Sequence, residues 1–172
     1  RCVATYIHDG KPIDSRVNRN SFYPTSGTRK LSSLVYDWFW NPMGAESKAL
    51  WQVDNIKTNT EKAYCCFNSN ARDFARFGKL YKDKGVWKNK PLLDSSFVKK
   101  SLNARFPSSP EYGYGFWLGK FEEKNYFTMR GHLGQYVIVF PDENIIIVRL
   151  GRMEEKTEEK AYIEEAFKMI NL

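Results

Sequence analysis

The hydrophobic and polar positions of this chain change their period near residue 112. Before that point apolar residues recur at the three- and four-residue spacing of helices, and after it they form short runs separated by turns. This order of patterns predicts an α+β fold in which helices flank one antiparallel sheet.

Four segments have helical spacing and are bounded by polar residues or proline. The expected helices cover residues 31–40, 71–84, 94–102 and, as a terminal amphipathic helix, 154–171. Asn70 and Asp94 are the expected N-caps of the second and third helices. The apolar stripes expected to face the core are Leu31, Leu34, Val35, Trp38 and Phe39; Phe74, Phe77, Leu80 and Tyr81; Phe97, Val98 and Leu102; and Ala161, Tyr162, Ala166, Phe167 and Ile170.

Four strand-like runs follow residue 112, and only short turns separate them. They cover residues 114–121, 126–130, 135–140 and 145–150. Strands joined by short turns pair as antiparallel neighbours, so the runs predict a meander at the C-terminal end of the domain. A short extended segment is also expected over 49–54, and a loop over 87–93.

Residues 1–30 differ in character from the rest of the chain. Val3–Ile7 is a short strand-like run, whereas residues 15–30 are polar and have no periodicity. We interpret residues 1–30 as an arm or linker and residues 31–172 as the folded domain.

The formal net charge of +7 raises the question of nucleic-acid binding. The basic residues are scattered, the segment 154–165 is acidic, and no nucleic-acid-binding signature is present, so we expect no nucleic-acid partner. No apolar run is long enough to span a membrane. Because the chain starts with Arg1 and not with methionine, we expect that an upstream export signal or membrane anchor was removed.

Cysteine and histidine are scarce. The cysteines are Cys2, Cys65 and Cys66, and adjacent cysteines do not pair easily with each other. We therefore expect Cys65 and Cys66 to be buried as small apolar groups rather than joined in a disulfide. The two histidines lie far apart and no Cys-x-x-Cys is present, so we expect neither a metal nor a cofactor.

A polar turn flanked by glycines precedes the third strand-like run, and its sequence is Gly131-His132-Leu133-Gly134-Gln135. Glycines at a strand entrance let the backbone approach a ligand, and N–H groups there are able to face a developing oxyanion. His132 is either a general base, because imidazole titrates near neutrality, or a structural histidine that hydrogen-bonds its neighbours.

Aromatic residues alternate with glycines from Tyr112 to Trp117. The segment either lines a pocket or forms a core strand that twists at its glycines. We assign Phe116 to the core, and Tyr112 and Trp117 to the walls of a substrate pocket.

Ser96-Phe97-Val98-Lys99 is the only Ser-x-x-Lys of the chain. This spacing places a serine hydroxyl one helical turn from a lysine that is able to take its proton. The alternative is structural, since Asp94 has the character of a cap and Lys99-Lys100 that of a solvated face. We favour the structural alternative.

Several segments together resemble the serine β-lactamase-related hydrolases, and within them the branch of class C-like esterases and 6-aminohexanoate-dimer hydrolases. The segments are Trp40–Glu46, Ala49–Trp51, Asp73–Leu80, Tyr112–Gly115 and Gly131–Gln135 with Pro141. The resemblance covers residues 31–172. It implies a penicillin-recognising fold, in which an antiparallel sheet backed by helices stands next to an all-helical part.

The resemblance also implies acyl transfer from an ester or amide. In that reaction the serine of a Ser-x-x-Lys attacks, the lysine and a Tyr-x-Asn or Tyr-x-Ser tyrosine move protons, and two backbone N–H groups hold the oxyanion. The family nucleophile lies upstream of the segment that Asp73–Leu80 resembles, whereas Ser96 lies downstream of it, and Tyr-x-Asn and Tyr-x-Ser are absent. The resemblance therefore implies the C-terminal portion of such a hydrolase, without the nucleophile region.

The third motif of the family has two registers here. In the first register, His132-Leu133-Gly134 aligns with the family's Lys-Thr-Gly, and the Gln135 backbone N–H donates to the oxyanion. In the second register, Gly131 aligns with the glycine of that motif, and the His132 backbone N–H donates to the oxyanion. We prefer the second register, because strand length fixes the distance to Pro141 and is harder to change than a side chain. His132 belongs to the site in both registers.

These inferences predict part of a serine hydrolase that is inactive as this chain alone. The alternative is a non-catalytic remnant that serves as a binding or structural module. We expect the sheet face that the missing helices would cover to expose aromatics, and hence self-association or a second chain that supplies the missing segment. The completed site would take a small ester or amide. The arm and the resemblance favour the cell envelope or periplasm.

Overall fold

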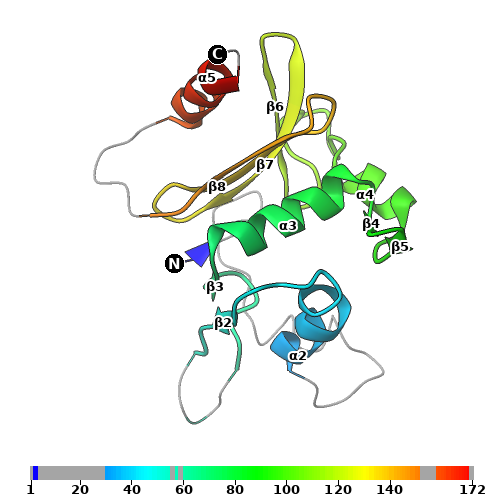
Figure 1. Ribbon diagram of the computed structural model, residues 1–172, viewed down its shortest axis with the longest axis vertical. Coiled ribbons are helices and arrows are strands. Elements are labelled where there is room, and N and C mark those ends of the chain that lie inside the picture. Colours follow the sequence, from blue (N-terminus) through cyan, green and yellow to red (C-terminus); the bar gives the residue numbers. More distant parts are fainter. Residues whose placement is uncertain (1, 4–29, 55–56, 58–59, 152–157, 171–172) are drawn as a thin grey trace.

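The computed structural model describes residues 2–3, 30–54, 57, 60–151 and 158–170. Most of the predicted arm and the first residues of the predicted terminal helix lie outside these ranges. The main body is a four-stranded sheet with a helix on each side, and a smaller lobe is formed by the described residues that precede residue 71 (Figure 1). None of the described helices is both long and apolar enough to cross a membrane.

The sheet is an antiparallel meander in the order β6-β7-β8-β9. Its strands are β6 (Trp117–Phe121), β7 (Lys124–Gly131), β8 (Gln135–Phe140) and β9 (Ile145–Arg149). Phe127 pairs with Val139, which pairs in turn with Ile146, so these three side chains share one face of the sheet. The meander predicted from the four apolar runs is confirmed.

α3 (Ala71–Lys82) covers this face of the sheet (Figure 1). Asn70 caps the helix as predicted, because its side chain accepts an N–H of the first turn at 2.8 Å. A Cβ on Gly78 would lie 3.1 Å from the side chains of Val137 and Val139, so glycine lets the helix approach the sheet closely. The cluster buried on this side comprises Phe74, Tyr81, Val98, Phe116, Phe127, Met129, Val137 and Val139.

α5 (Glu159–Ile170) covers the opposite face. Its buried apolar residue is Ile163, whereas Ile170, predicted to face the core, is 58% exposed. Ile170 lies on the same side of the helix as Ile163 but at its end, so the prediction for this residue is wrong. The cluster buried under α5 comprises Phe121, Ile138, Phe140 and Ile163.

Within the described residues, therefore, helices cover both faces of the sheet. The prediction that a sheet face exposes aromatics is wrong. The exposed large aromatic side chains lie elsewhere, on the first helix and in or after the helix α4 (Ser95–Ser101), and are Tyr36, Trp38, Phe97, Phe106 and Tyr114.

The helix predicted over residues 31–40 is present but changes its winding part-way. α2 (Leu31–Val35) is an α-helix, and η1 (Tyr36–Trp40) is a π-helix with hydrogen bonds that span five residues. The wider turn rotates the later side chains relative to a 3.6-residue period. Trp40 is therefore buried, and Trp38, which was predicted to face the core, is 52% exposed.

Asp73 on α3 fixes the loop that follows η1. Its carboxylate is fully buried and accepts the N–H groups of Glu46 at 2.8 Å and Ser47 at 3.0 Å. The Arg76 guanidinium donates to the same carboxylate at 2.7 Å. Charge-assisted hydrogen bonds thus tie the loop to the start of α3.

Short strands complete the lobe. β1 (Cys2–Val3), β3 (Phe67–Asn68) and β2 (Leu50–Trp51) form a three-stranded sheet in the order β1-β3-β2. β2 confirms the extended segment predicted over 49–54. The lobe packs on α3 through a second buried cluster of Trp40, Met43, Leu80 and Trp87.

The region predicted as a loop over 87–93 contains a small hairpin instead. Its strands are β4 (Val86–Trp87) and β5 (Lys90–Pro91). The hairpin closes because Lys88 and Asn89 both take positive φ, 46° and 66°, as a type I′ turn requires.

α4 (Ser95–Ser101) begins at Asp94, whose carboxylate accepts the Phe97 N–H at 3.0 Å, as the predicted cap requires. Val98 is buried as predicted, but Phe97 is 45% exposed. The seven-residue helix packs on the core through Val98 and Ser101, which lie three residues apart on one side.

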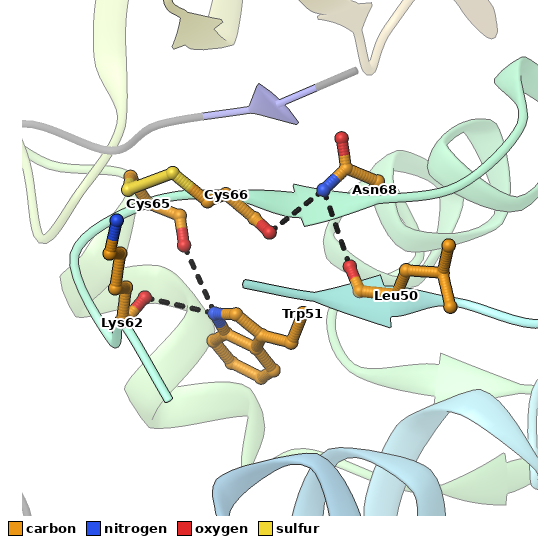
Figure 2. The surroundings of a disulfide bond; sticks show 6 residues. All are labelled: Leu50, Trp51, Lys62, Cys65, Cys66 and Asn68. Carbon is orange, nitrogen blue, oxygen red and sulfur yellow. Dashed lines mark hydrogen bonds between the residues drawn. A yellow bond between two sulfur atoms is a disulfide. The ribbon is translucent and has the colours of Figure 1, made fainter. Parts of the chain in front are cut away.

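Cys65 and Cys66 are joined by a disulfide, so the prediction that they remain unpaired is wrong (Figure 2). Cys66 has a φ of +70°, in the left-handed region that residues other than glycine rarely adopt. This conformation brings the two neighbouring sulfurs within bonding reach. The sequence predicted no disulfide between Cys65 and Cys66, because the side chains of adjacent residues usually point apart.

Candidate functional site

The glycine-flanked segment forms the turn between β7 and β8. Gly131 pairs with Gln135, and His132, Leu133 and Gly134 make the turn itself. Leu133 and Gly134 have φ values of 58° and 75°, which is the left-handed conformation of a tight three-residue hairpin loop. The predicted site residues of this segment are thus held together at one end of the sheet.

Side chains from β8 and β9 hold the carbonyl groups of this turn. The Arg149 guanidinium donates to the Gly134 carbonyl at 2.9 Å and to the Leu133 carbonyl at 3.3 Å. The buried Gln135 side chain donates to the Gly151 carbonyl and accepts the Gly151 N–H at 2.9 Å. The turn therefore has a fixed shape although it lies at the surface.

His132 lies at the tip of the turn and is exposed to solvent. Its imidazole makes no hydrogen bond to any residue that the structure describes. Those residues supply no carboxylate that hydrogen-bonds the ring and orients it. The backbone of the turn is held in a fixed position, whereas the His132 side chain is not held by the described residues. The backbone is therefore the better-defined chemical feature of this site.

The two neighbours of β7 pair with it to different extents near the turn. β8 pairs with β7 as far as Gly131, whereas β6 pairs with it only as far as Thr128. On the β6 side, Met129–Gly131 have no paired strand among the described residues. β1 contacts β7 and β8, and Figure 1 shows it near the start of α3.

The two predicted pocket walls contact each other close to this part of β7. The ring centroids of Tyr112 and Trp117 are 4.9 Å apart, and the two residues form an isolated β-bridge. The Arg130 guanidinium lies 4.7 Å from the centroid of Trp117, and Arg130 directly precedes Gly131. The structure thus places Tyr112 and Trp117 beside the turn, as one stack with Arg130.

Arg130 also forms an ion pair with Glu159 of α5, at 2.7 Å from Nε to Oε2. Burial raises the pKa of Glu159, and the charge of Arg130 and a hydrogen bond from Tyr126 oppose this shift. Burial likewise raises the pKa of Tyr112, which favours its neutral phenol.

Sequence reasoning missed Arg130, Arg149 and Glu159. The available signal was that Arg130 adjoins Gly131. Arg149 and Glu159 carry no local signal, because their partners come from other elements.

A groove of about 720 Å³ lies in the smaller lobe, between η1 and β2. Its aromatic lining is Tyr36, Trp40, Trp51 and Phe67, and its polar lining includes Ser33, Asp37 and Ser47. None of Gly131–Gln135, Tyr112 or Trp117 lines it. The groove is therefore separate from the candidate turn, and the sequence did not predict it.

Ser96 is exposed, and its hydroxyl donates to the Asp94 carboxylate at the start of α4. That hydrogen bond contributes to the lowered pKa of Asp94. Among the described residues no group of histidine, cysteine, aspartate and glutamate side chains could hold a metal ion.

Solved structures share this fold. The chain aligns with a Bacillus anthracis protein described as a putative 6-aminohexanoate-dimer hydrolase, at a TM-score of 0.70 and 24% identity. It also aligns with a putative beta-lactamase from Bacteroides dorei DSM 17855, at a TM-score of 0.58 and 16% identity. The chain has the fold of part of a β-lactamase-related hydrolase. The fold that the motifs implied is confirmed.

The alignments cover 84% and 81% of this chain but only 38% of the first neighbour and 51% of the second. The chain therefore spans about half of each neighbour's length or less. At these identities the likeness concerns the fold alone. No protein-family model and no curated protein matches the sequence.

Proposed function

We propose that this chain is the sheet-bearing portion of a serine hydrolase of the β-lactamase-related family, which acts on an ester or amide by acyl transfer. The observation that carries the proposal is the fixed turn at Gly131–Gln135, beside the part of β7 that has no β6 partner among the described residues. The turn belongs to a fold shared with proteins described as a putative 6-aminohexanoate-dimer hydrolase and a putative beta-lactamase.

The role proposed for the turn is oxyanion binding by backbone N–H groups. Arg149 holds the Leu133 and Gly134 carbonyls, and the Gln135 side chain ties the end of the turn to Gly151, so the amides of the turn need no rearrangement when charge develops on a substrate. His132 contributes its amide in the preferred register. Tyr112 and Trp117 form the adjacent wall that contacts the acyl or leaving group.

The chain alone is proposed to be inactive. Ser96, in the only Ser-x-x-Lys, is engaged with Asp94 at a helix cap, on the wrong side of Asp73–Leu80 for the family nucleophile. Loss of a nucleophile removes most of the rate and leaves only the smaller contribution of the oxyanion site.

A fluorophosphonate probe tests this assignment on two forms of the protein. The purified 172-residue chain should show no labelled serine and no hydrolysis of p-nitrophenyl acetate or nitrocefin. The polypeptide isolated from its own cells should be longer and carry the label on a serine outside these residues. A Ser96→Ala variant is the matched control, and labelling that disappears in it would contradict the proposal.

The second candidate is a non-catalytic binding or structural module. It is favoured by the absence of Tyr-x-Asn, Tyr-x-Ser and an upstream Ser-x-x-Lys from the sequence. An isolated native polypeptide that takes no label on any serine, while its fold is intact by circular dichroism, would select this candidate.

We further propose that the protein works outside the cytosol, in the cell envelope or periplasm. The Cys65–Cys66 disulfide supports this location, because disulfides persist in oxidising compartments. The proposed partner is a second chain or segment that supplies the nucleophile, with self-association as the alternative. Exposed Tyr36 and Trp38 on the smaller lobe offer it an aromatic surface. A monodisperse monomer by light scattering, with no bound partner, would contradict this proposal.

A further inference from the structure

The Cys65–Cys66 disulfide lies on the segment that leads into β3, beside the groove of the smaller lobe. Both cysteines are half-buried, so a small thiol has access to them. The next residue, Phe67, lines the groove together with Trp51 of β2. We propose that Cys65–Cys66 is a reversible thiol–disulfide exchange site, and that its reduction by a dithiol loosens one wall of the groove.

The first link from the disulfide to the groove is the carbonyl of Cys65. It accepts the indole N–H of Trp51 at 3.0 Å, and the same N–H also donates to the Lys62 carbonyl at 2.9 Å (Figure 2). This shared hydrogen bond orients the Trp51 ring. The ring lies against Phe67, with centroids 5.1 Å apart, and both rings line the groove.

The second link is the carbonyl of Cys66. It accepts the Asn68 side-chain N–H at 2.8 Å and the backbone N–H of Gln52 at 3.1 Å. The Asn68 amide also reaches the Leu50 carbonyl at 3.4 Å. The two consecutive carbonyls of the cysteine pair therefore hold β2 in place through one indole, one side-chain amide and one backbone amide.

The direction of these carbonyls depends on the cross-link. The disulfide closes a ring that includes the peptide unit between the two cysteines, and within it Cys66 has a φ of +70°. When the ring opens, Cys66 is an ordinary residue in a conformation that non-glycine residues rarely adopt. Relaxation to negative φ rotates the peptide units on either side and withdraws their carbonyls from Trp51 and Asn68.

The effect should remain local. A cross-link between adjacent residues closes the shortest loop a chain can form, so it removes little conformational entropy from the unfolded state. The two main buried clusters of the sheet contain neither cysteine. Reduction therefore changes the groove without unfolding the sheet.

The exchange is a two-electron reaction with a dithiol as reductant. A thiolate of the dithiol attacks one cysteine sulfur, the S–S bond breaks, and the other cysteine leaves as a thiolate that takes up a proton. The second thiol of the reductant then attacks the mixed disulfide. Cys65 and Cys66 end as thiols, and the dithiol, which has lost two electrons and two protons, ends as a cyclic disulfide.

Hydrogen exchange with mass spectrometry tests the proposal on the folded chain with and without dithiothreitol. Iodoacetamide trapping should show that both cysteines react in the reduced native protein, and peptide mapping separates them from Cys2. Amide exchange in residues 50–53 and 65–68 should rise roughly fivefold to tenfold, the factor for loss of one hydrogen bond. Exchange in β8 should not change, and oxidised dithiothreitol should restore protection.

Two double variants test the backbone mechanism. Cys65→Ala/Cys66→Ala should resemble the reduced protein, whereas Cys65→Ala/Cys66→Gly should keep more protection, because glycine takes positive φ without strain. Equal exchange in the two variants would contradict the mechanism. A disulfide that dithiothreitol leaves intact in the native protein, reduction without a change in residues 50–53, or reduction that also exposes β8 would each overturn the proposal.

Discussion

The side chain of Gln135 and the backbone of Gly151 form a reciprocal pair of hydrogen bonds. The Gln135 Oε1 accepts the Gly151 N–H at 2.9 Å, and its Nε2 donates to the Gly151 carbonyl. Both residues are buried. The pair ties the start of β8 to the residue that follows Leu150, after the end of β9. The side chain of Gln135 therefore supports the candidate turn from within the protein.

Replacement of Gln135 by alanine should destabilise the chain by about 1–3 kcal/mol, because the buried Gly151 N–H would lose its acceptor and the Gly151 carbonyl would keep only Arg149 as a donor. Urea denaturation followed by tryptophan fluorescence measures the loss. Gln52→Ala is the matched control, since this residue is exposed, and it should cost less than about 0.5 kcal/mol. Equal losses in the two variants would contradict a supporting role for Gln135.

Asp73→Ala should be among the most destabilising single substitutions, at about 3 kcal/mol or more. It removes a fully buried carboxylate that accepts two loop N–H groups and the Arg76 guanidinium, and it leaves the two loop N–H groups without this acceptor, whereas Arg76 keeps Glu46. Glu165→Ala breaks an exposed pair with Lys168 and should change stability by less than about 1 kcal/mol. A comparable effect of the two substitutions on the urea midpoint would count against the buried network.

The stability of the chain should respond to Glu159 at mildly acidic pH. Burial raises the pKa of this carboxyl in the folded state, so between the ordinary value and the raised one the folded protein binds more protons than the unfolded protein. The contribution of Glu159 to stability must then fall as pH rises through that window. Glu159→Gln removes this term, so the stability of the variant relative to wild type should increase from pH 4 upward.

The measurement is the free energy of unfolding of both proteins at a series of pH values. The difference in the free energy of unfolding between the two proteins reports on Glu159 alone. Glu46 and Asp94 have lowered pKa values and lose their contributions to stability on acidification, but they are present in both proteins and cancel. Arg130, Tyr126 and Tyr136 face the carboxylate and remain in both proteins. A difference that is constant with pH would show that Glu159 titrates normally.

Gly113→Ala should be strongly destabilising for a steric reason. A Cβ at this position would lie 2.1 Å from the carbonyl oxygen of Ser101 at the end of α4, so the backbone would have to move, at a cost of about 1–3 kcal/mol or more. Gly44 is the control: its φ is +64°, but nothing lies within 4 Å of the added atom. Gly44→Ala should cost about 1–2 kcal/mol from backbone strain alone. A smaller loss for Gly113→Ala than for Gly44→Ala would contradict the close contact.

Much of the secondary structure could be predicted from local patterns. The meander followed from four apolar runs with short turns, and the starts of α3 and α4 followed from Asn70 and Asp94. Period and capping depend on residues a few positions apart, which the sequence states directly. The composition of the candidate turn was also visible, because glycine, histidine and glutamine adjoin each other there.

Other features required the assembled structure. Trp38, which was predicted to face the core, is exposed because a π-helical turn altered the winding, and Cys65 is bonded to Cys66 because the latter adopts positive φ. The hydrogen-bond partner of the Gln135 side chain is Gly151, sixteen residues further along the chain. The sequence by itself determined the elements, the caps and the place of the turn. The tertiary structure decided which side chains hold that turn, because their partners lie on separate strands and helices that meet only when the sheet and α5 pack together.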